Sequence, residues 1–191
     1  MNNPFDNLQA IFANKYLADR EKYLILPLLN RSVSLVNGIE VIATKNQECS
    51  ACLGVLVRGL LEVAMTIAHV FTLDEKTTAE QIEFFTSNGR IGEKNSNGKM
   101  IWVKTKTLED AYDKLNGTNI KEAYDSLSMM THFSGVHAGQ TILIDNEQTF
   151  KVRLDGRQED EKEICKKATQ AASIITGSIS KMLRKEYIKA K

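Results

Sequence analysis

A chain of 191 residues, 42% of them hydrophobic, is long enough to bury a sizeable core and has the length of a single domain. Its 25 basic residues nearly balance its 24 acidic ones, which leaves a formal net charge of +1. That balance argues against a protein that coats nucleic acid or an anionic membrane over its whole surface, although it is compatible with a local basic patch.

The chain carries no pattern typical of export or of a membrane span. Its first residues lack a basic flank followed by an apolar run, so we expect no secretory signal. The longest apolar stretch, residues 51–71, is interrupted by Arg58, Glu62 and His69. We therefore expect no membrane partner and a cytoplasmic protein.

The three cysteines bear on the redox state of the protein. Their number is odd, and without an export signal we expect free thiols. Cys49 and Cys52 have the spacing of a redox CxxC motif. Such a motif normally lies where a strand meets a helix, whereas a helix is expected to precede this one, and Glu48 would raise the thiol pKa. We do not expect a redox role.

The first half of the chain predicts long helices. Apolar residues recur at helical spacing from Asn7 to Ala43, and Pro27 is expected to kink or split this region because it removes a backbone donor and clashes with the preceding turn. Residues 47–71 predict a second helix that is apolar around most of its circumference. A helix of that kind belongs at the centre of a fold.

A shorter helix and a polar excursion follow. Thr78, with Gln81 three residues later, has the spacing of a capping box and predicts a helix through Phe85. Residues 87–106 contain three glycines and several polar residues, and Met100 to Val103 is expected to form a strand. They predict a small hairpin that turns at Asn97-Gly98.

The second half of the chain predicts helices around one β-hairpin. The expected elements are helices at 108–115 and 120–133, strands at 141–145 and 149–154, and a long amphipathic helix at 158–185. We see no internal repeat and no linker. The sequence thus predicts one domain, residues 1–191, that is mainly α: an antiparallel helical bundle with a small β-hairpin near 141–154.

Three ionisable side chains share one face of the most apolar helix. At 3.6 residues per turn, Glu62 lies one turn beyond Arg58, and His69 returns to nearly the same face. Because an unpaired buried charge is costly, these groups must be paired, hydrated or exposed in a cleft. They could form an ion pair between helices with His69 as a core histidine, or they could line a binding or catalytic site.

A second polar face occurs in residues 124–137, YDSLSMMTHFSGVH. Tyr124, Ser128 and His132 are four residues apart and share a helix face. Gly135 is expected to end this helix, which would place His132 in the last turn, where the helix dipole raises its pKa. His137 follows in the loop. Alternatively, the histidine simply caps the last carbonyls of its own helix.

No metal or cofactor is expected. His132 and His137 are five residues apart across a predicted helix end, with no carboxylate near them before Asp145, so the ligand set for zinc is incomplete. The chain also lacks the glycine-rich phosphate loop and the nucleophile elbow of α/β-hydrolases.

The two polar faces together resemble a known group. Arg58 and Glu62 form Arg-x-x-x-Glu, and after a long insertion Tyr-x-x-Leu-Ser-x-x-x-His follows at Tyr124 to His132. Over about residues 47–137 this pattern resembles HEPN-like helical-bundle families of bacterial proteins. The resemblance implies an all-α bundle, often dimeric and common in toxin–antitoxin and phage-defence systems. It therefore implies a homodimer with RNA or a protein as partner.

Active HEPN members cut RNA with an Arg-x(4–6)-His motif at the dimer interface, and this chain departs from that motif. The window after Arg58, residues 63–65, contains no histidine. A ribonuclease would need the fold to bring His132 or His137 to Arg58. The histidine would then be the general acid or base, and the arginine would stabilise phosphoryl charge.

Three functional hypotheses remain. The favoured one is a binding or regulatory module in defence or stress response, whose binding residues are Arg58, Glu62, His69, Tyr124, Ser128 and His132. The alternatives are a ribonuclease with Arg58, His132 and His137 as catalytic residues, or a dimeric bundle in which the polar groups only specify packing.

Overall fold

The computed structural model describes residues 17–44, 50–132, 140–146, 149–154 and 161–188. The predicted helix before residue 17, the helix end at Gly135, and His137 lie outside these ranges. The described chain is mainly helical and carries two small antiparallel sheets of two strands each. The predicted helical bundle with a small β-hairpin is thereby confirmed.

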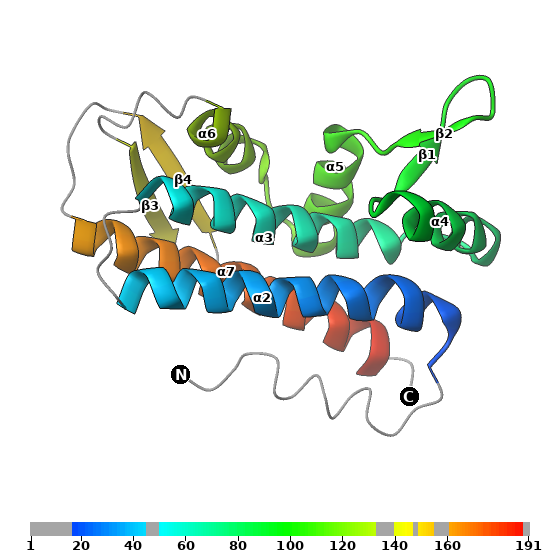
Figure 1. Cartoon of the computed structure of the whole chain (residues 1–191), viewed down its shortest axis with the longest axis horizontal. Helices are drawn as coiled ribbons and strands as arrows, with labels where there is room; N and C mark the ends of the chain where they lie inside the picture. Colours follow the sequence, from blue (N-terminus) through cyan, green and yellow to red (C-terminus); the bar gives the residue numbers. More distant parts are fainter. Residues whose placement is uncertain (1–16, 45–49, 133–139, 147–148, 155–160, 189–191) are drawn as a thin grey trace.

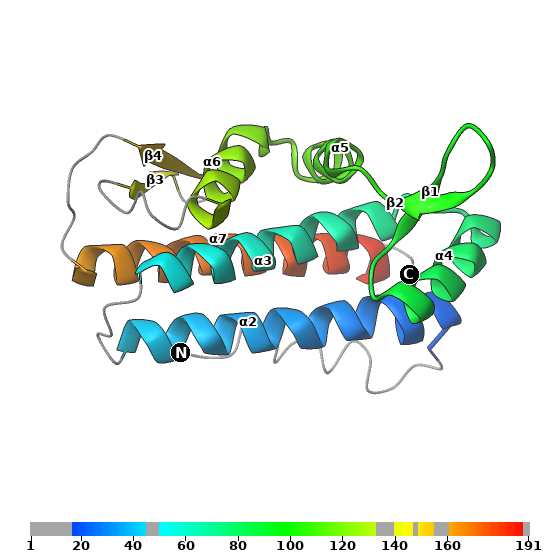
Figure 2. The same cartoon turned by 45° about the horizontal axis from the view of Figure 1, so that its top comes forward.

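Three long helices lie side by side and form the body of the bundle (Figure 1). They are α2 (Leu26–Thr44), α3 (Ser50–Val70) and α7 (Glu161–Ile188). In Figure 1, α2 runs antiparallel to α3 and α7. Figure 2 shows α2 on one side of α3, and the shorter helices α5 (Thr105–Asn116) and α6 (Lys121–His132) on the other.

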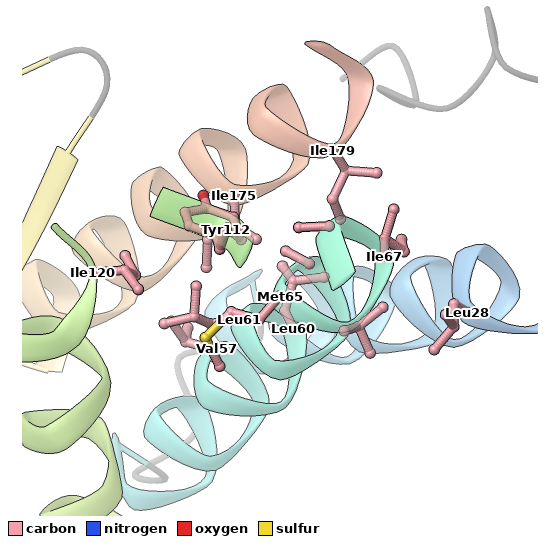
Figure 3. Close-up of a cluster of buried hydrophobic side chains, with 14 of the residues drawn as sticks. Leu28, Val57, Leu60, Leu61, Met65, Ile67, Tyr112, Ile120, Ile175 and Ile179 are labelled. Carbon is pink, nitrogen blue, oxygen red and sulfur yellow. The ribbon is translucent and has the colours of Figure 1, made fainter. Parts of the chain in front are cut away.

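The hydrophobic core is centred on α3. This helix buries apolar side chains on several sides, as its sequence predicted, because it packs against α2, α5, α6 and α7. The central side chains come from several helices and meet in one cluster (Figure 3). Those labelled in the view include Val57, Leu60, Leu61, Met65, Ile67, Tyr112, Ile175 and Ile179.

The start of α2 is irregular where proline predicts it. The chain is helical from Asp19, but the five residues Glu21–Ile25 form a π-helical turn (η1), and α2 begins directly afterwards. Pro27 cannot donate to a carbonyl in the preceding turn and would clash with it. A widened π-helical turn at this point relieves the conflict without ending the helix.

Helix α4 (Glu75–Asn88) starts earlier than expected. Asp74 is its N-cap, and its carboxylate accepts a hydrogen bond from the Thr77 amide at 2.7 Å. The predicted capping box of Thr78 and Gln81 is therefore wrong. Gln81 is buried instead, and its side-chain amide both donates to the Gly92 carbonyl and accepts from the Gly92 amide.

Gln81 thereby fastens α4 to the predicted hairpin in the polar excursion. The hairpin consists of β1 (Gly92–Lys94) and β2 (Met100–Trp102), which pair antiparallel. Gly98 adopts a φ of 74°, as the expected Asn97-Gly98 turn requires. A second hairpin pairs β3 (Gln140–Asn146) with β4 (Thr149–Leu154), with an irregularity in register between Ile144 and Asn146.

Two helical stretches, Glu21–Thr44 and Cys52–Val70, are long and apolar enough to cross a membrane by length and composition alone. Most of the second stretch is buried inside the bundle, and the core helix of a soluble protein has the same character. The cytoplasmic location stays a prediction.

The cysteines differ from one another. Cys165 is buried in the core, whereas Cys52 forms a disulfide. The expectation of free thiols is therefore wrong at Cys52. Cys49 lies outside the described residues.

Candidate functional site

Arg58, Glu62 and Tyr124 form a closed hydrogen-bonded triangle between α3 and α6. The Arg58 guanidinium pairs with Glu62 Oε1 at 3.1 Å, and the Tyr124 hydroxyl donates to the same oxygen at 3.0 Å. Arg58 Nη2 also donates to the Tyr124 hydroxyl oxygen at 3.3 Å. The Arg58 Cζ atom lies 5.5 Å from the centroid of the Tyr124 ring. The structure thus brings together residues from both polar helix faces, which are 62 positions apart at Glu62 and Tyr124.

Helix geometry explains this convergence. Arg58 and Glu62 lie one turn apart on α3, so their side chains extend from the same face. Tyr124 lies in the first half of α6, which packs against α3, and its ring is buried while its hydroxyl reaches the ion pair. Tyrosine suits this position because it combines an apolar body with a polar tip.

The triangle keeps Arg58 charged. Burial alone lowers the pKa of the Arg58 guanidinium, but the hydrogen bond to Tyr124 and the charge of Glu62 outweigh burial and raise the pKa above its usual value. Arg58 is therefore a fixed cation that can bind an anion or hold Glu62.

The triangle is open to solvent on one side. Exposure is 21% for the Arg58 side chain and 38% for the Glu62 side chain. All three residues line a cavity of about 660 Å³, which α2, α3, the segment after α4, the first hairpin, α5 and α6 enclose together. The polar groups are therefore part of a concave surface and are not sealed in a dry core.

A similar triangle elsewhere shows what a purely structural version looks like. Arg20 pairs with Glu21 at 2.9 Å, and the Tyr187 hydroxyl donates to Glu21 at 2.8 Å. This cluster ties the start of the first helix to the end of α7. Here, however, the carboxylate is buried, and none of the three residues lines the cavity. The exposure of Glu62 is the feature that sets the first triangle apart.

The cavity wall contains three functional candidates that sequence reasoning missed. Arg31 of α2, Arg90 after α4 and Trp102 of β2 all line it. Trp102 is 59% exposed, and the Arg90 Cζ atom lies 4.6 Å from the centroid of the Trp102 ring. One signal was present in the sequence: Trp102 is the only tryptophan of the chain and lies in the short apolar run Met100–Val103 of the excursion.

The remaining predicted site residues lie elsewhere or cannot be placed. His69 is half-buried in the last turn of α3 and is not among the described residues of the cavity wall. Burial lowers the pKa of its imidazole, and the charge of Glu93 partly opposes this effect. Ser128 lies one turn after Tyr124 on α6 but is likewise absent from that wall. His132 ends α6, and its side chain and all of His137 lie outside the described structure.

Within the described ranges, no three side chains of the histidine, cysteine, aspartate or glutamate type gather closely enough to hold a metal ion. The described cavity wall also contains no histidine, cysteine or lysine. What the arrangement offers chemically is a set of fixed cations, one paired carboxylate, a phenol and an exposed indole.

Comparisons with protein-family models, with curated proteins and with solved structures give no match to this chain. The cavity and the residues that line it are therefore the features that bear on function.

Proposed function

We propose that the protein is a HEPN-like helical-bundle module that binds a ligand in the cavity beside Arg58, Glu62 and Tyr124. Its role would be binding or regulation, without chemical turnover, in a bacterial defence or stress response. The observation that supports binding is the exposed, charged triangle on the wall of a cavity of about 660 Å³. Ligand sites commonly have volumes of this order and combine an apolar lining with a few convergent polar groups.

The chemistry of the wall favours binding over catalysis. A general acid or base needs a pKa near the working pH, and Arg58 stays charged. Glu62 already accepts from both Arg58 and Tyr124, so its carboxylate is held in place by two donors. These groups are suited to orienting a ligand. The HEPN-like and defence assignments come from the sequence resemblance, and a homodimer with RNA or a protein partner remains part of the proposal.

A neutral fluorescent probe tests whether the cavity accepts a ligand. N-phenyl-1-naphthylamine increases its emission when it enters an apolar site, and we expect saturable binding to the full-length protein. Val55 is 51% exposed and lines the cavity, whereas Val41 is 50% exposed on α2 and does not line it. These two valines form a matched pair for an added indole.

We expect Val55→Trp to weaken probe binding by about tenfold or more because the larger side chain fills part of the cavity. Val41→Trp should leave binding unchanged. If the probe does not bind saturably, or if the two variants bind it equally well, the cavity is not the ligand site. Circular dichroism of both variants verifies that the helices are retained.

A further inference from the structure

The charges around the cavity are unbalanced. Its described wall contains three arginines, Arg31, Arg58 and Arg90, and one acidic residue, Glu62. Glu62 is already engaged by Arg58 and Tyr124. In the described part of the chain, neither Arg31 nor Arg90 forms an ion pair with an acidic side chain. A concave surface with this excess of positive charge attracts anions and disfavours cations.

The apolar part of the wall is suited to a flat ligand. Trp102 presents a largely exposed indole on this wall, and an indole combines a large apolar ring with an N–H donor that can contact an aromatic ligand. Arg90 stacks on that indole, and guanidinium planes also stack on aromatic ligands. Leu35, Val55 and Leu108 add apolar surface from α2, α3 and α5.

Arginine further narrows the class of anion. Its guanidinium presents paired N–H donors that match the two oxygens of a carboxylate, a sulfonate or a phosphate. We infer that the ligand is a small organic oxyanion with a planar aromatic body. The oxyanion would pair with Arg31 and Arg58, and the aromatic body would lie beside Trp102 and Arg90. This inference rests on the proposed function, because it names the ligand class of the same cavity.

Two probes that share one aromatic body test whether the cavity selects an aromatic oxyanion. The anion 8-anilinonaphthalene-1-sulfonate has nearly the same aromatic body as neutral N-phenyl-1-naphthylamine and adds a sulfonate. We expect the anion to bind more tightly. Arg31→Gln should weaken binding of the anion by about tenfold, the usual order for a lost charge-assisted hydrogen bond, and leave the neutral probe unaffected. Arg90→Gln should weaken both probes because it removes a charge and a stacking partner.

Arg184 supplies the matched control. It is exposed on α7 and does not line the cavity, so Arg184→Gln removes the same charge without changing the wall. Equal affinity for the two probes, or equal effects of Arg31→Gln and Arg184→Gln on the anion, would overturn the inference while the proposed binding function stands. If neither the anionic nor the neutral probe binds saturably, both the inference and the proposed binding function fail.

Competition then separates the possible oxyanions. Bound 8-anilinonaphthalene-1-sulfonate is challenged with 1-naphthoate, a carboxylate, and with 1-naphthyl phosphate. Displacement by either one supports the inference and identifies the preferred group. If neither compound displaces the sulfonate at concentrations well above the Kd of the sulfonate, the site does not select oxyanions and the inference fails.

Discussion

Tyr124 donates its hydroxyl hydrogen to Glu62 across 3.0 Å and so joins α6 to α3. In Tyr124→Phe the ring stays buried, but Glu62 loses one donor. We expect the free energy of unfolding in urea to fall by about 1 kcal/mol, the usual net contribution of such a bond. Tyr23→Phe removes a hydroxyl from an exposed ring on the helix before α2 and should change stability by less than about 0.5 kcal/mol. Equal effects of the two substitutions would mean that the bond to Glu62 contributes nothing measurable.

His69 should make the protein sensitive to mild acid. Burial lowers the pKa of its imidazole below the ordinary value of 6.5. The neutral form is therefore favoured in the folded state, so the stability linked to His69 is fully present above pH 6.5 and is lost as pH falls through the folded pKa. Urea unfolding between about pH 7.5 and about pH 5.5 measures this change.

The pH dependence should be smaller in His69→Gln, which does not titrate in that range. It should be larger in Glu93→Gln, because the charge of Glu93 partly opposes the lowering of the His69 pKa. An unchanged pH dependence in His69→Gln would assign the effect to other groups.

Gly177 offers a stabilising substitution. It is exposed inside α7, and a Cβ atom added there would meet nothing within 4 Å. Because glycine in a helix interior loses more conformational freedom than alanine, Gly177→Ala should raise the free energy of unfolding by about 0.5–1 kcal/mol. Thermal unfolding measures the change in stability, and a Tm below that of the wild type would contradict the prediction.

Gly92 should behave in the opposite way. A Cβ atom at Gly92 would lie 2.8 Å from the Ile101 carbonyl oxygen and 2.8 Å from the Phe84 ring, so the hairpin would have to move away from α4. We expect Gly92→Ala to destabilise the protein by about 1–3 kcal/mol and to shift the emission of Trp102 in the same hairpin. Ser96→Ala, in the exposed turn of that hairpin, is the control and should change neither quantity.

Binding without turnover predicts that the purified protein leaves RNA intact. Single-stranded RNA is incubated with wild type and with His132→Ala, and the products are separated by gel electrophoresis. The expected result is no cleavage by either protein. Cleavage by wild type that is lost in His132→Ala, with an unchanged circular dichroism spectrum, would favour the ribonuclease alternative. Equal cleavage by both proteins would indicate a contaminating nuclease, and further purification should then remove the activity.

Local and periodic features of the fold were predictable from the sequence. The nearly continuous apolar circumference of residues 47–71 predicted a central helix, and α3 occupies that place. Asn97-Gly98 predicted the turn of the first hairpin because few other pairs adopt its backbone geometry. The start of α4 differs from the prediction because Asp74 and Thr78 both suit a helix N-terminus, and the hydrogen bond from the Thr77 amide to the Asp74 carboxylate shows that Asp74 is the cap.

The candidate site was predictable only in part. The spacing of Arg58 and Glu62 on one helix and the polar face that contains Tyr124 identified two groups that meet in the fold. Arg31, Arg90 and Trp102 were missed because they come from separate elements and share no periodic pattern. Their proximity arises from tertiary packing around α3, which spacing along a single helix does not reveal.

The central position of α3 has a consequence for how the molecule opens. Because α3 shares its buried surface with α2, α5, α6 and α7, its backbone amides reach water only when the whole bundle comes apart. Those amides should exchange hydrogen at the rate of global unfolding. The hairpin of β1 and β2 is different because most of its residues are at least partly exposed, and the bonds between Gln81 and Gly92 fasten it to α4. Its amides should exchange through a smaller, independent opening, and the wall of the cavity that carries Trp102 should therefore open more often than the helical core.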